Sequence, residues 1–361
     1  MTSRPTPPAT PARPPVSGPG APARRALTRV RTAAVRVAYR AEVGATALLS
    51  RLAARRGWSE AVLPYTGIGA PDHVRVLARV VLAAPGAEPS EVVGVAGWRR
   101  LLTLERPGAR LDVEVAGRRH ELVSGPGGFV DVDLEQRLPA GWSDVLFHVT
   151  GRKQVPALVQ VASSEAAVGV VCDIDDTAWV TGLRHPLRAA WRTLARGSEG
   201  RQAVPGTAAL LRSVLGSQRD PAVVYLSNGP WNLAGPVARF LARNGFPRGS
   251  LLMTDWGPRP DRFFRDGQAH KRGSLERLAR DLPWVRWVLV GDDGEHDPAI
   301  YADFIRSHPG RVVAVAMRQV RIVEDEGPRT ELVEGVPFVH ASDGHRLQQM
   351  LADVLAAAPG R

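Results

Sequence analysis

The segment VGVVCDIDDTAWV, residues 168–180, decides the fold that we expect for this chain. Its apolar run ends abruptly in three carboxylates, Asp173, Asp175 and Asp176. A short apolar run of this kind is typical of a strand that is buried on both faces of a parallel sheet. Ligands of such sheets bind beyond the carboxyl ends of the strands, so the acidic residues indicate a site there.

Strands and helices alternate from about residue 167 onward. This alternation predicts an α/β domain over 155–361, in which helices cover both faces of a parallel sheet. After the first strand, we expect strands in PAVVYLSN (221–228), GSLLMTD (249–255), VRWVLVGDD (285–293) and RVVAVAM (311–317), and helices over 205–217, about 234–244, 271–282, 297–308 and about 343–357.

The residues before this domain have a different character. Between residues 73 and 150, short Val-rich runs, often alternating with polar residues, are separated by Gly/Pro turns. They predict a small antiparallel β domain over 62–150, of the sandwich type. It contains no pattern that indicates a ligand, and we expect a scaffold or an interaction module.

The N-terminal part is basic. Residues 1–60 hold 11 Arg and 2 acidic residues, so most of the net charge of +11 lies there. Residues 1–22 are rich in Pro and Ala, which predicts disorder, and residues 23–58 have the spacing of an amphipathic helix with an Arg-rich face. Either this helix lies on an anionic membrane, or it packs on the folded domains with its Arg face in water.

Cysteine usage and apolar content set the broad class of protein. The one cysteine, Cys172, excludes an internal disulfide framework and indicates a reducing compartment. No apolar run reaches the roughly 18 residues that a membrane span needs, and residues 1–25 lack the apolar core of a secretory signal. We expect a cytoplasmic protein, in peripheral contact with a membrane if the basic helix binds lipid; Arg-rich leaders also occur in organelle transit peptides.

Asp173 and Asp175 are the first candidate site residues. They are two positions apart, so in an extended segment their side chains point the same way. Two carboxylates in one site repel each other unless a cation neutralises them. The pair suits a nucleophile and a general acid/base with a metal ion nearby, while Thr177 can hydrogen-bond into the following loop. Taken alone, the stretch is equally consistent with an acidic loop or a helix cap.

Two later positions carry groups that suit a phosphate. Ser227 and Asn228 end the second strand, where a hydroxyl and open backbone amides either donate to a phosphate oxygen or form an ordinary turn. Lys271, one of only two lysines in the chain, opens the next helix. Its positive charge would offset the negative charge of a transferring phosphoryl group.

A second acidic group follows the fourth strand. Asp292 and Asp293 stand at the strand end, and Asp297 comes shortly after them. Oxygen ligands in this arrangement suit Mg²⁺. Because Asp297 precedes Pro298, we expect it to act partly as a helix cap and partly behind the metal ligands.

In chain order these groups are an acid pair, a hydroxyl, a lysine and an acid pair, which matches phosphoryl transfer through an aspartyl-phosphate. The order resembles the haloacid-dehalogenase-like superfamily of phosphatases. More narrowly, a set of segments within about 155–325 resembles the bacterial and fungal phosphatidate phosphatase family with this type of catalytic domain: DIDDT (173–177), YLSNGPWNL (225–233), LLMTDWG (251–257), HK (270–271) and GDDGEHDPAIY (291–301).

This resemblance implies Mg²⁺-dependent hydrolysis of phosphatidate to diacylglycerol and phosphate. It implies Asp173 as the nucleophile, Asp175 as the acid/base, and Ser227 and Lys271 on the phosphate. It also implies that Asp173, the backbone carbonyl of Asp175, and Asp292 hold Mg²⁺. His270 and Asp255 match family positions without an assigned step, and Asp293 stands where the family usually has Ser, so its role stays open.

Two other functions stay open on the sequence. One is a phosphatase that acts on another phosphomonoester, such as a nucleotide end or a sugar phosphate. The other is a non-catalytic module that binds an anionic membrane or nucleic acid through the Arg-rich segment. Because most of the basic charge lies in the N-terminal part, nucleic acid is not the partner that we expect.

Overall fold

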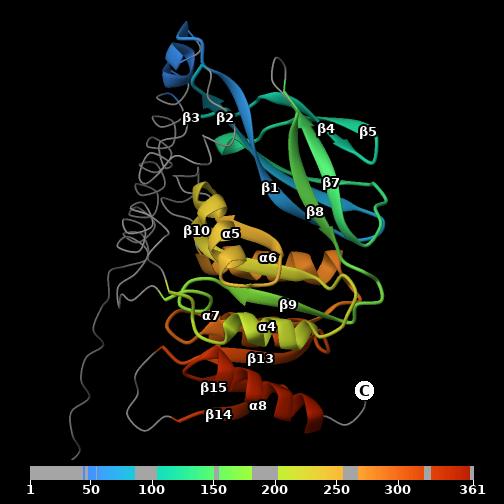
Figure 1. Cartoon of the computed structure of the whole chain (residues 1–361), viewed down its shortest axis with the longest axis vertical. Coiled ribbons are helices and arrows are strands. Elements are labelled where there is room, and N and C mark those ends of the chain that lie inside the picture. Colours follow the sequence, from blue (N-terminus) through green and yellow to red (C-terminus); the bar gives the residue numbers. More distant parts are fainter. Residues whose placement is uncertain are drawn as a thin grey trace, which may run out of the picture.

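The computed structural model describes residues 44, 48–53, 55–85, 104–149, 154–180, 202–254, 267–320 and 327–357. They form two sheets, which lie one above the other in Figure 1. The predicted leader 1–22 and most of the predicted helix 23–58 lie outside the described residues, although residues 48–53 are helical. Within the described residues, the helices are all too short or too polar to cross a membrane.

The C-terminal sheet has the strand order β11-β10-β9-β12-β13-β15-β14. All neighbouring strands from β11 to β15 pair in parallel, and β14 pairs with β15 in antiparallel fashion at one edge. The strands are β9 (Val168–Asp173), β10 (Val223–Pro230), β11 (Ser250–Thr254), β12 (Arg286–Asp292), β13 (Val312–Arg318), β14 (Arg329–Val333) and β15 (Val336–Ala341).

Helices follow the strands of this sheet along the chain. The interior strands β9 and β12 are buried along almost their whole length, as in a sheet with both faces covered. Helix α4 packs with α8, and α6 packs with α7. The helices are α4 (Thr207–Leu215), α5 (Ala234–Arg243), α6 (Gly267–Asp281), α7 (Asp297–Ser307) and α8 (Gly344–Ala357), and a short 3-10 turn, η4 (Trp231–Leu233), precedes α5.

Two features of this domain differ from the sequence prediction. The hairpin β14–β15 was not predicted; it turns at Glu334 and Gly335, which both have positive φ as a tight hairpin turn requires. Helix α6 begins at Gly267, so Lys271 lies in its second turn and does not open it. The polar segment before Lys271 has little apolar periodicity, which is the signal on which a predicted helix start depends.

The N-terminal sheet also departs from the prediction. Its strands form one hydrogen-bonded sheet of order β3-β2-β1-β8-β7-β4-β5, with β6 beside β2, and the sandwich type stays a prediction. Strand β8, predicted to lie in the α/β domain, pairs in parallel with β1 and extends this sheet beyond residue 150. The strands are β1 (Ser59–Gly69), β2 (Val74–Ala83), β3 (Leu104–Glu105), β4 (Arg110–Val115), β5 (Arg118–Val123), β6 (Phe129–Leu134), β7 (Gly141–His148) and β8 (Val155–Val161), with a 3-10 turn η2 (Pro126–Gly128).

The two sheets are in direct contact, as Figure 1 shows where β1 and β8 descend onto the α/β domain. The Ser250 hydroxyl, on β11, donates a hydrogen bond to the Gly67 carbonyl of β1 at 2.7 Å. The Gln160 amide, on β8, donates to the Pro221 carbonyl at 2.9 Å. Both bonds lie where the chain enters β10 and β11, away from the strand ends that carry the candidate site residues.

Candidate active site

Strand β9 places Asp173 at the centre of the candidate site. Asp173 is the last residue of β9, which lies between β10 and β12. In the parallel register Asp173 pairs with Leu226, so Ser227 is the next residue of β10, while Cys172 pairs with Val290, so Asp292 ends β12 close by. The strand order therefore brings side chains from three distant segments to one edge of the sheet.

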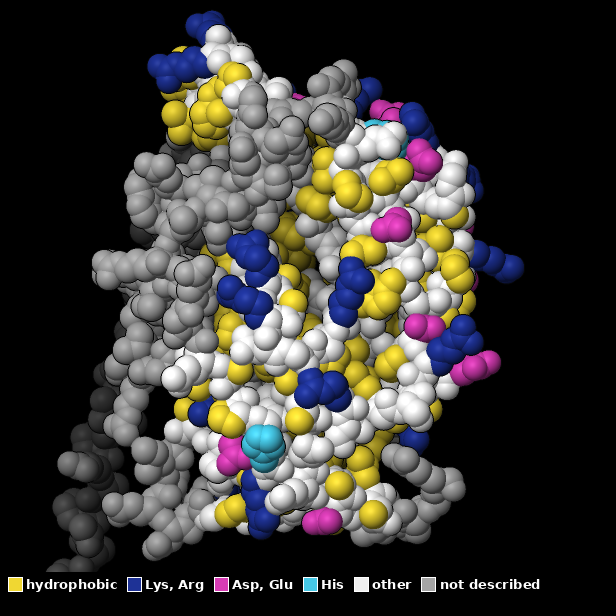
Figure 2. Space-filling view, in the orientation of Figure 1, with side chains coloured by type: hydrophobic (Ala, Val, Ile, Leu, Met, Phe, Trp, Pro, Cys, Tyr) yellow, Lys and Arg dark blue, Asp and Glu magenta, His cyan; other side chains and the backbone are white. Residues whose placement is uncertain are grey.

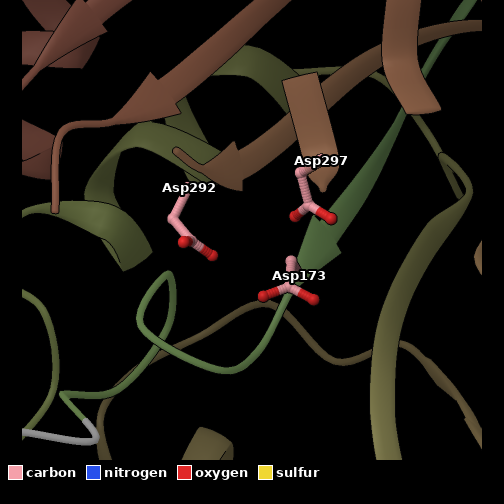
Figure 3. Close-up of side chains that lie close together, drawn as sticks. All are labelled: Asp173, Asp292 and Asp297. Atoms are coloured by element: carbon pink, nitrogen blue, oxygen red, sulfur yellow. The ribbon is translucent and has the colours of Figure 1, made fainter. Parts of the chain in front are cut away.

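Three carboxylates converge at this edge. Oxygen atoms of Asp173, Asp292 and Asp297 all lie within 4.8 Å of one another, and Figure 3 shows the three carboxylates facing a common space. We call these residues the acidic cluster. Each is at most 3% exposed. Burying three carboxylates so close together is costly unless positive charge compensates them.

Lys271 supplies one such charge from helix α6. Its Nζ lies 2.6 Å from Asp173 Oδ1 and 2.5 Å from Asp297 Oδ1. Burial alone would lower the pKa of Lys271, but the two carboxylates outweigh it and raise the pKa well above its ordinary value. The ammonium therefore stays charged and bridges Asp173 and Asp297.

One ammonium does not balance three carboxylates. Burial raises the pKa of Asp173 well above its ordinary value, although Lys271 opposes this, and the neighbouring carboxylates raise it further. Burial, and next the charge of Asp297, raise the pKa of Asp292 to about 7. Among the residues that the structure describes, Asp292 forms no ion pair, and its acceptors meet only the Gly294 N–H at 2.7 Å and the Thr177 hydroxyl at 3.4 Å.

The acidic cluster fits a divalent cation. Its donors are carboxylate oxygens, which hard cations such as Mg²⁺ prefer. When all three carboxylates are ionised, the charge of Lys271 compensates one of them, and two negative charges remain uncompensated. In addition, Asp297 Oδ2 is buried without a hydrogen-bond partner among the described residues. Lys271 pairs with Oδ1 of Asp173 and with Oδ1 of Asp297, so each of these residues keeps its second oxygen for such an ion, and Asp292 pairs with no cation among the described residues.

Asp175 lies beside this cluster and makes separate contacts. Its carboxylate accepts hydrogen bonds from the Ser227 hydroxyl at 3.1 Å and from the Trp179 indole N–H at 3.1 Å. Asp175 is half-buried, whereas Asp173 is buried. The structure thus separates the two carboxylates of the predicted pair: Asp173 joins Lys271, and Asp175 joins Ser227. The role predicted for the Asp175 backbone carbonyl stays a prediction.

Ser227 and Asn228 lie in the irregular last part of β10, where its register with β11 shifts between Leu226 and Pro230. We call this part the Ser227–Asn228 loop, and several groups hold it in place. The Gly229 N–H donates to the Ser227 hydroxyl oxygen at 2.9 Å, and the Thr254 hydroxyl donates to the Asn228 carbonyl at 2.7 Å. The Asn228 amide donates to Glu295 at 3.3 Å. Glu295 was not among the predicted site residues, although it lies in the quoted GDDGEHD stretch.

The remaining candidates take supporting positions. Asp293 accepts a hydrogen bond from the Val320 N–H at 2.6 Å, which joins the loop after β12 to the end of β13. The ring nitrogen Nε2 of His270 lies 3.4 Å from the Leu252 carbonyl. Asp176 has a φ of 54°, and its carbonyl accepts a hydrogen bond from Arg318 at 2.5 Å. Asp255 lies outside the described residues.

The prediction that Asp297 acts as a helix cap is wrong. Asp297 is the first residue of α7, and the capping position before it is occupied by His296, which makes no side-chain cap. The Asp297 carboxylate turns instead to Lys271, because a buried ammonium attracts it more strongly than a partly exposed helix end. Asp297 thereby belongs to the acidic cluster itself.

The middle of the chain is similar to a known catalytic domain. Residues 168–319 match the family model for the catalytic domain of phosphatidate phosphatase APP1. Phosphatidate phosphatase APP1 of Saccharomyces cerevisiae is 24% identical over 156 residues, which cover 43% of this chain and 26% of the yeast protein. An uncharacterized protein of Schizosaccharomyces pombe is 27% identical over 154 residues, which cover 42% of this chain and 25% of that protein.

These relatives are much longer than the matched segment: the alignments span about a quarter of the curated relatives' length. The match runs from β9 to just beyond β13 and includes Asp175, Ser227, Lys271 and the whole acidic cluster. Among solved structures, a carbohydrate acetylesterase from Xanthomonas citri covers 80% of this chain and 72% of its own at 12% identity, but with a TM-score of 0.26 it bears on neither fold nor function.

Proposed function

We propose that this chain is a Mg²⁺-dependent phosphatidate phosphatase, which hydrolyses phosphatidate to diacylglycerol and phosphate. One observation carries the proposal: the segment that matches the catalytic domain family holds a buried acidic cluster with a lysine at the carboxyl end of the interior strand β9. Asp173, Lys271 and Asp292 there combine a nucleophile, a fixed positive charge and oxygen ligands, which phosphoryl transfer needs.

In the proposed mechanism, an Asp173 oxygen attacks phosphorus and the bond from phosphorus to the glycerol oxygen breaks. Asp175 gives its proton to the leaving oxygen. Asp175 then takes a proton from water as the water oxygen attacks the phosphorus of the aspartyl-phosphate, which releases phosphate and frees Asp173. Asp173 and Asp292 would hold Mg²⁺, which would supply positive charge against the phosphoryl oxygens.

The contacts in the site support this division of roles. Lys271 holds Asp173 in one orientation. Burial raises the pKa of Asp173, and the charge of Lys271 opposes this rise and so favours the ionised form that a nucleophile requires. The Ser227 hydroxyl, 3.1 Å from Asp175, ties the acid/base to the loop that we propose for the phosphate. Asn228 and Lys271 complete the donors on that side of the site.

We also propose a haloacid-dehalogenase-like fold for the α/β domain. The parallel pairing from β11 to β15 and the interior place of β9, between β10 and β12, support it. So does the position of Asp173, Ser227 and Asp292, which come from three adjacent strands and meet at one edge of the sheet.

We further propose peripheral binding to an anionic membrane through residues 48–56. Leu48, Leu49 and Leu52 are among the most exposed large apolar side chains of the described residues, and Arg51 and Arg55 beside them are exposed as well. Figure 2 shows apolar side chains next to basic ones at the end of the molecule where Figure 1 draws this short helix. Exposed leucines flanked by arginines suit the headgroup region of an anionic bilayer.

The test is phosphate release, with Mg²⁺, from phosphatidate vesicles and from a soluble phosphomonoester. We expect Asp173→Asn to lower the rate at least about a thousandfold on both substrates, as loss of a nucleophile does. Asp176→Asn is the matched control in the same loop, because Asn tolerates positive φ and the Asp176 side chain is outside the acidic cluster. Activity that survives in Asp173→Asn contradicts the nucleophile, and hydrolysis of the soluble substrate alone contradicts the lipid substrate.

A further inference from the structure

We infer that the N-terminal β domain positions the Ser227–Asn228 loop of the active site, through Arg79 and a pocket of aromatic side chains. The inference rests on the proposed function, since it gives the β domain a part in that reaction. It concerns the second half of the segment SNGPWN, residues 227–232. Its first two residues line the site, but Trp231 and Asn232 make their contacts in the β domain.

Arg79 is the polar half of this connection. It lies on β2 and is 2% exposed. Its guanidinium donates to the Asn232 side-chain oxygen, to the Glu105 carboxylate of β3, and to the Gly127 carbonyl, the last at 2.8 Å. A buried guanidinium is stable only when its donors and its charge are met, so Arg79 and its partners fix one another's positions.

Trp231 is the apolar half. It is 4% exposed, and its ring lies 4.5 Å from that of Tyr65 on β1 and 5.1 Å from that of Phe129 on β6, measured between ring centroids. Aromatic rings packed at these distances add specific orientation to the area that they bury. Neighbouring residues of η4 are thus held by side chains from three strands of the β domain.

Only Gly229 and Pro230 separate these contacts from Ser227 and Asn228. On the opposite side, Thr254 of β11 donates to the Asn228 carbonyl. The loop is therefore held from its own sheet at Thr254 and from the β domain at Trp231 and Asn232. A displacement of the loop would carry Ser227 away from Asp175, and a shift of about 1 Å in a catalytic group can lower a rate about a hundredfold.

The experiment compares two variants, each of which removes a different hydrogen bond between the two domains. Asn232→Ala removes the acceptor for Arg79 next to the loop. Ser250→Ala removes the hydroxyl that donates to Gly67 at 2.7 Å, at the beginning of β11 and opposite Val224 of β10. We expect Asn232→Ala to lower kcat/KM about tenfold to a hundredfold. Ser250→Ala should leave kcat/KM within about twofold of the wild-type value. The two variants should lose a comparable amount in Tm. Asn232→Asp keeps an acceptor oxygen for Arg79 and should restore most of the activity.

Backbone hydrogen exchange over residues 227–233 of the full chain gives a readout that needs no activity. The inference predicts faster exchange there in Asn232→Ala than in Ser250→Ala. Unchanged exchange overturns the connection, and faster exchange with unchanged kcat/KM overturns its role in positioning. If both alanine variants lose activity equally, in proportion to their losses in Tm, the contact between Arg79 and Asn232 only stabilises the fold. This result also overturns the inference. A wild-type chain without phosphatase activity contradicts the proposed function and with it the positioning role, while exchange still shows whether the contact holds the loop.

Discussion

Lys271 is the residue on which the stability of the acidic cluster most depends. Its ammonium contacts Asp173 and Asp297, both buried, so Lys271→Met leaves two buried carboxylates without their cation. Breaking a buried ion pair by removing one partner costs about 3–5 kcal/mol. We expect a loss of that order in the free energy of unfolding in urea, together with loss of activity.

The double variant Lys271→Met/Asp297→Asn isolates the cause of that loss. It removes one of the uncompensated charges, so part of the stability should return while activity stays absent, because Asp173 still lacks its partner. Unfolding of the single variant within about 1 kcal/mol of wild type would contradict the charge balance that we describe.

The raised pKa of Asp292 predicts how the stability of the metal-free protein depends on pH. Its pKa is raised to about 7 in the folded state, against about 4 in the unfolded chain. Between these values the folded state holds a proton that the unfolded state has released, so stability falls as pH rises from about 4 to 7. Mg²⁺ binds the ionised carboxylates, so we expect it to raise Tm more at pH 8 than at pH 6.

Asp292→Asn provides the comparison for this pH dependence. The uncharged side chain should weaken the fall in Tm with pH, and Mg²⁺ should no longer raise Tm appreciably. The measurement is thermal unfolding with chelator or Mg²⁺ at both pH values. An equal effect of Mg²⁺ on Asp292→Asn and wild type would show that the ion binds elsewhere.

At the scale of elements, the beginning of helix α6 limits what can replace Gly267. A Cβ there would lie 2.7 Å from the Asn228 side chain, so Gly267→Ala must displace Asn228. We expect Gly267→Ala to lower kcat/KM about tenfold, because Asn228 is displaced. The free energy of unfolding should change little. Gly273→Ala is the control in the same helix, since a Cβ there meets nothing within 4 Å. It should leave activity unchanged and stabilise the helix by about 0.5–1 kcal/mol, measured by urea unfolding. Equal activities of the two variants would exclude a role for the position of Asn228.

Elements also show what could be predicted from the sequence. Strands β9 to β13 were predicted from their apolar runs. Strands that are buried on both faces contain few polar residues, so these runs are easily recognised. The hairpin β14–β15 was missed, because its outer strand is largely exposed and lacks an apolar run. Asp173, Asp292 and Lys271 were each named from the sequence. The contact between Lys271 and Asp297 was not predicted, because it depends on how α6 packs against α7, which no local pattern records.

At the scale of the whole molecule, the exposed leucines of residues 48–52 predict binding to vesicles. Replacing Leu48, Leu49 and Leu52 together by Ser should weaken binding to phosphatidate-containing vesicles at least about tenfold, because each inserted leucine contributes on the order of 1 kcal/mol. Leu332→Ser is the control, since Leu332 is also exposed but lies on β14, at the other end of the molecule in Figure 1. Vesicle sedimentation measures both, and equal binding of the triple variant and wild type would contradict this surface.

The most direct test of the whole account is the covalent state of Asp173 during turnover. Asp175→Asn with para-nitrophenyl phosphate suits it, because this leaving group needs no acid while release of phosphate from the enzyme needs the base. The reaction is quenched in acid and reduced with borohydride, which converts an aspartyl-phosphate to an alcohol that mass spectrometry locates. The account predicts a burst of nitrophenol equal to the enzyme concentration, with the modification at Asp173. A burst that leaves Asp173 unmodified, or that modifies another residue, would contradict it.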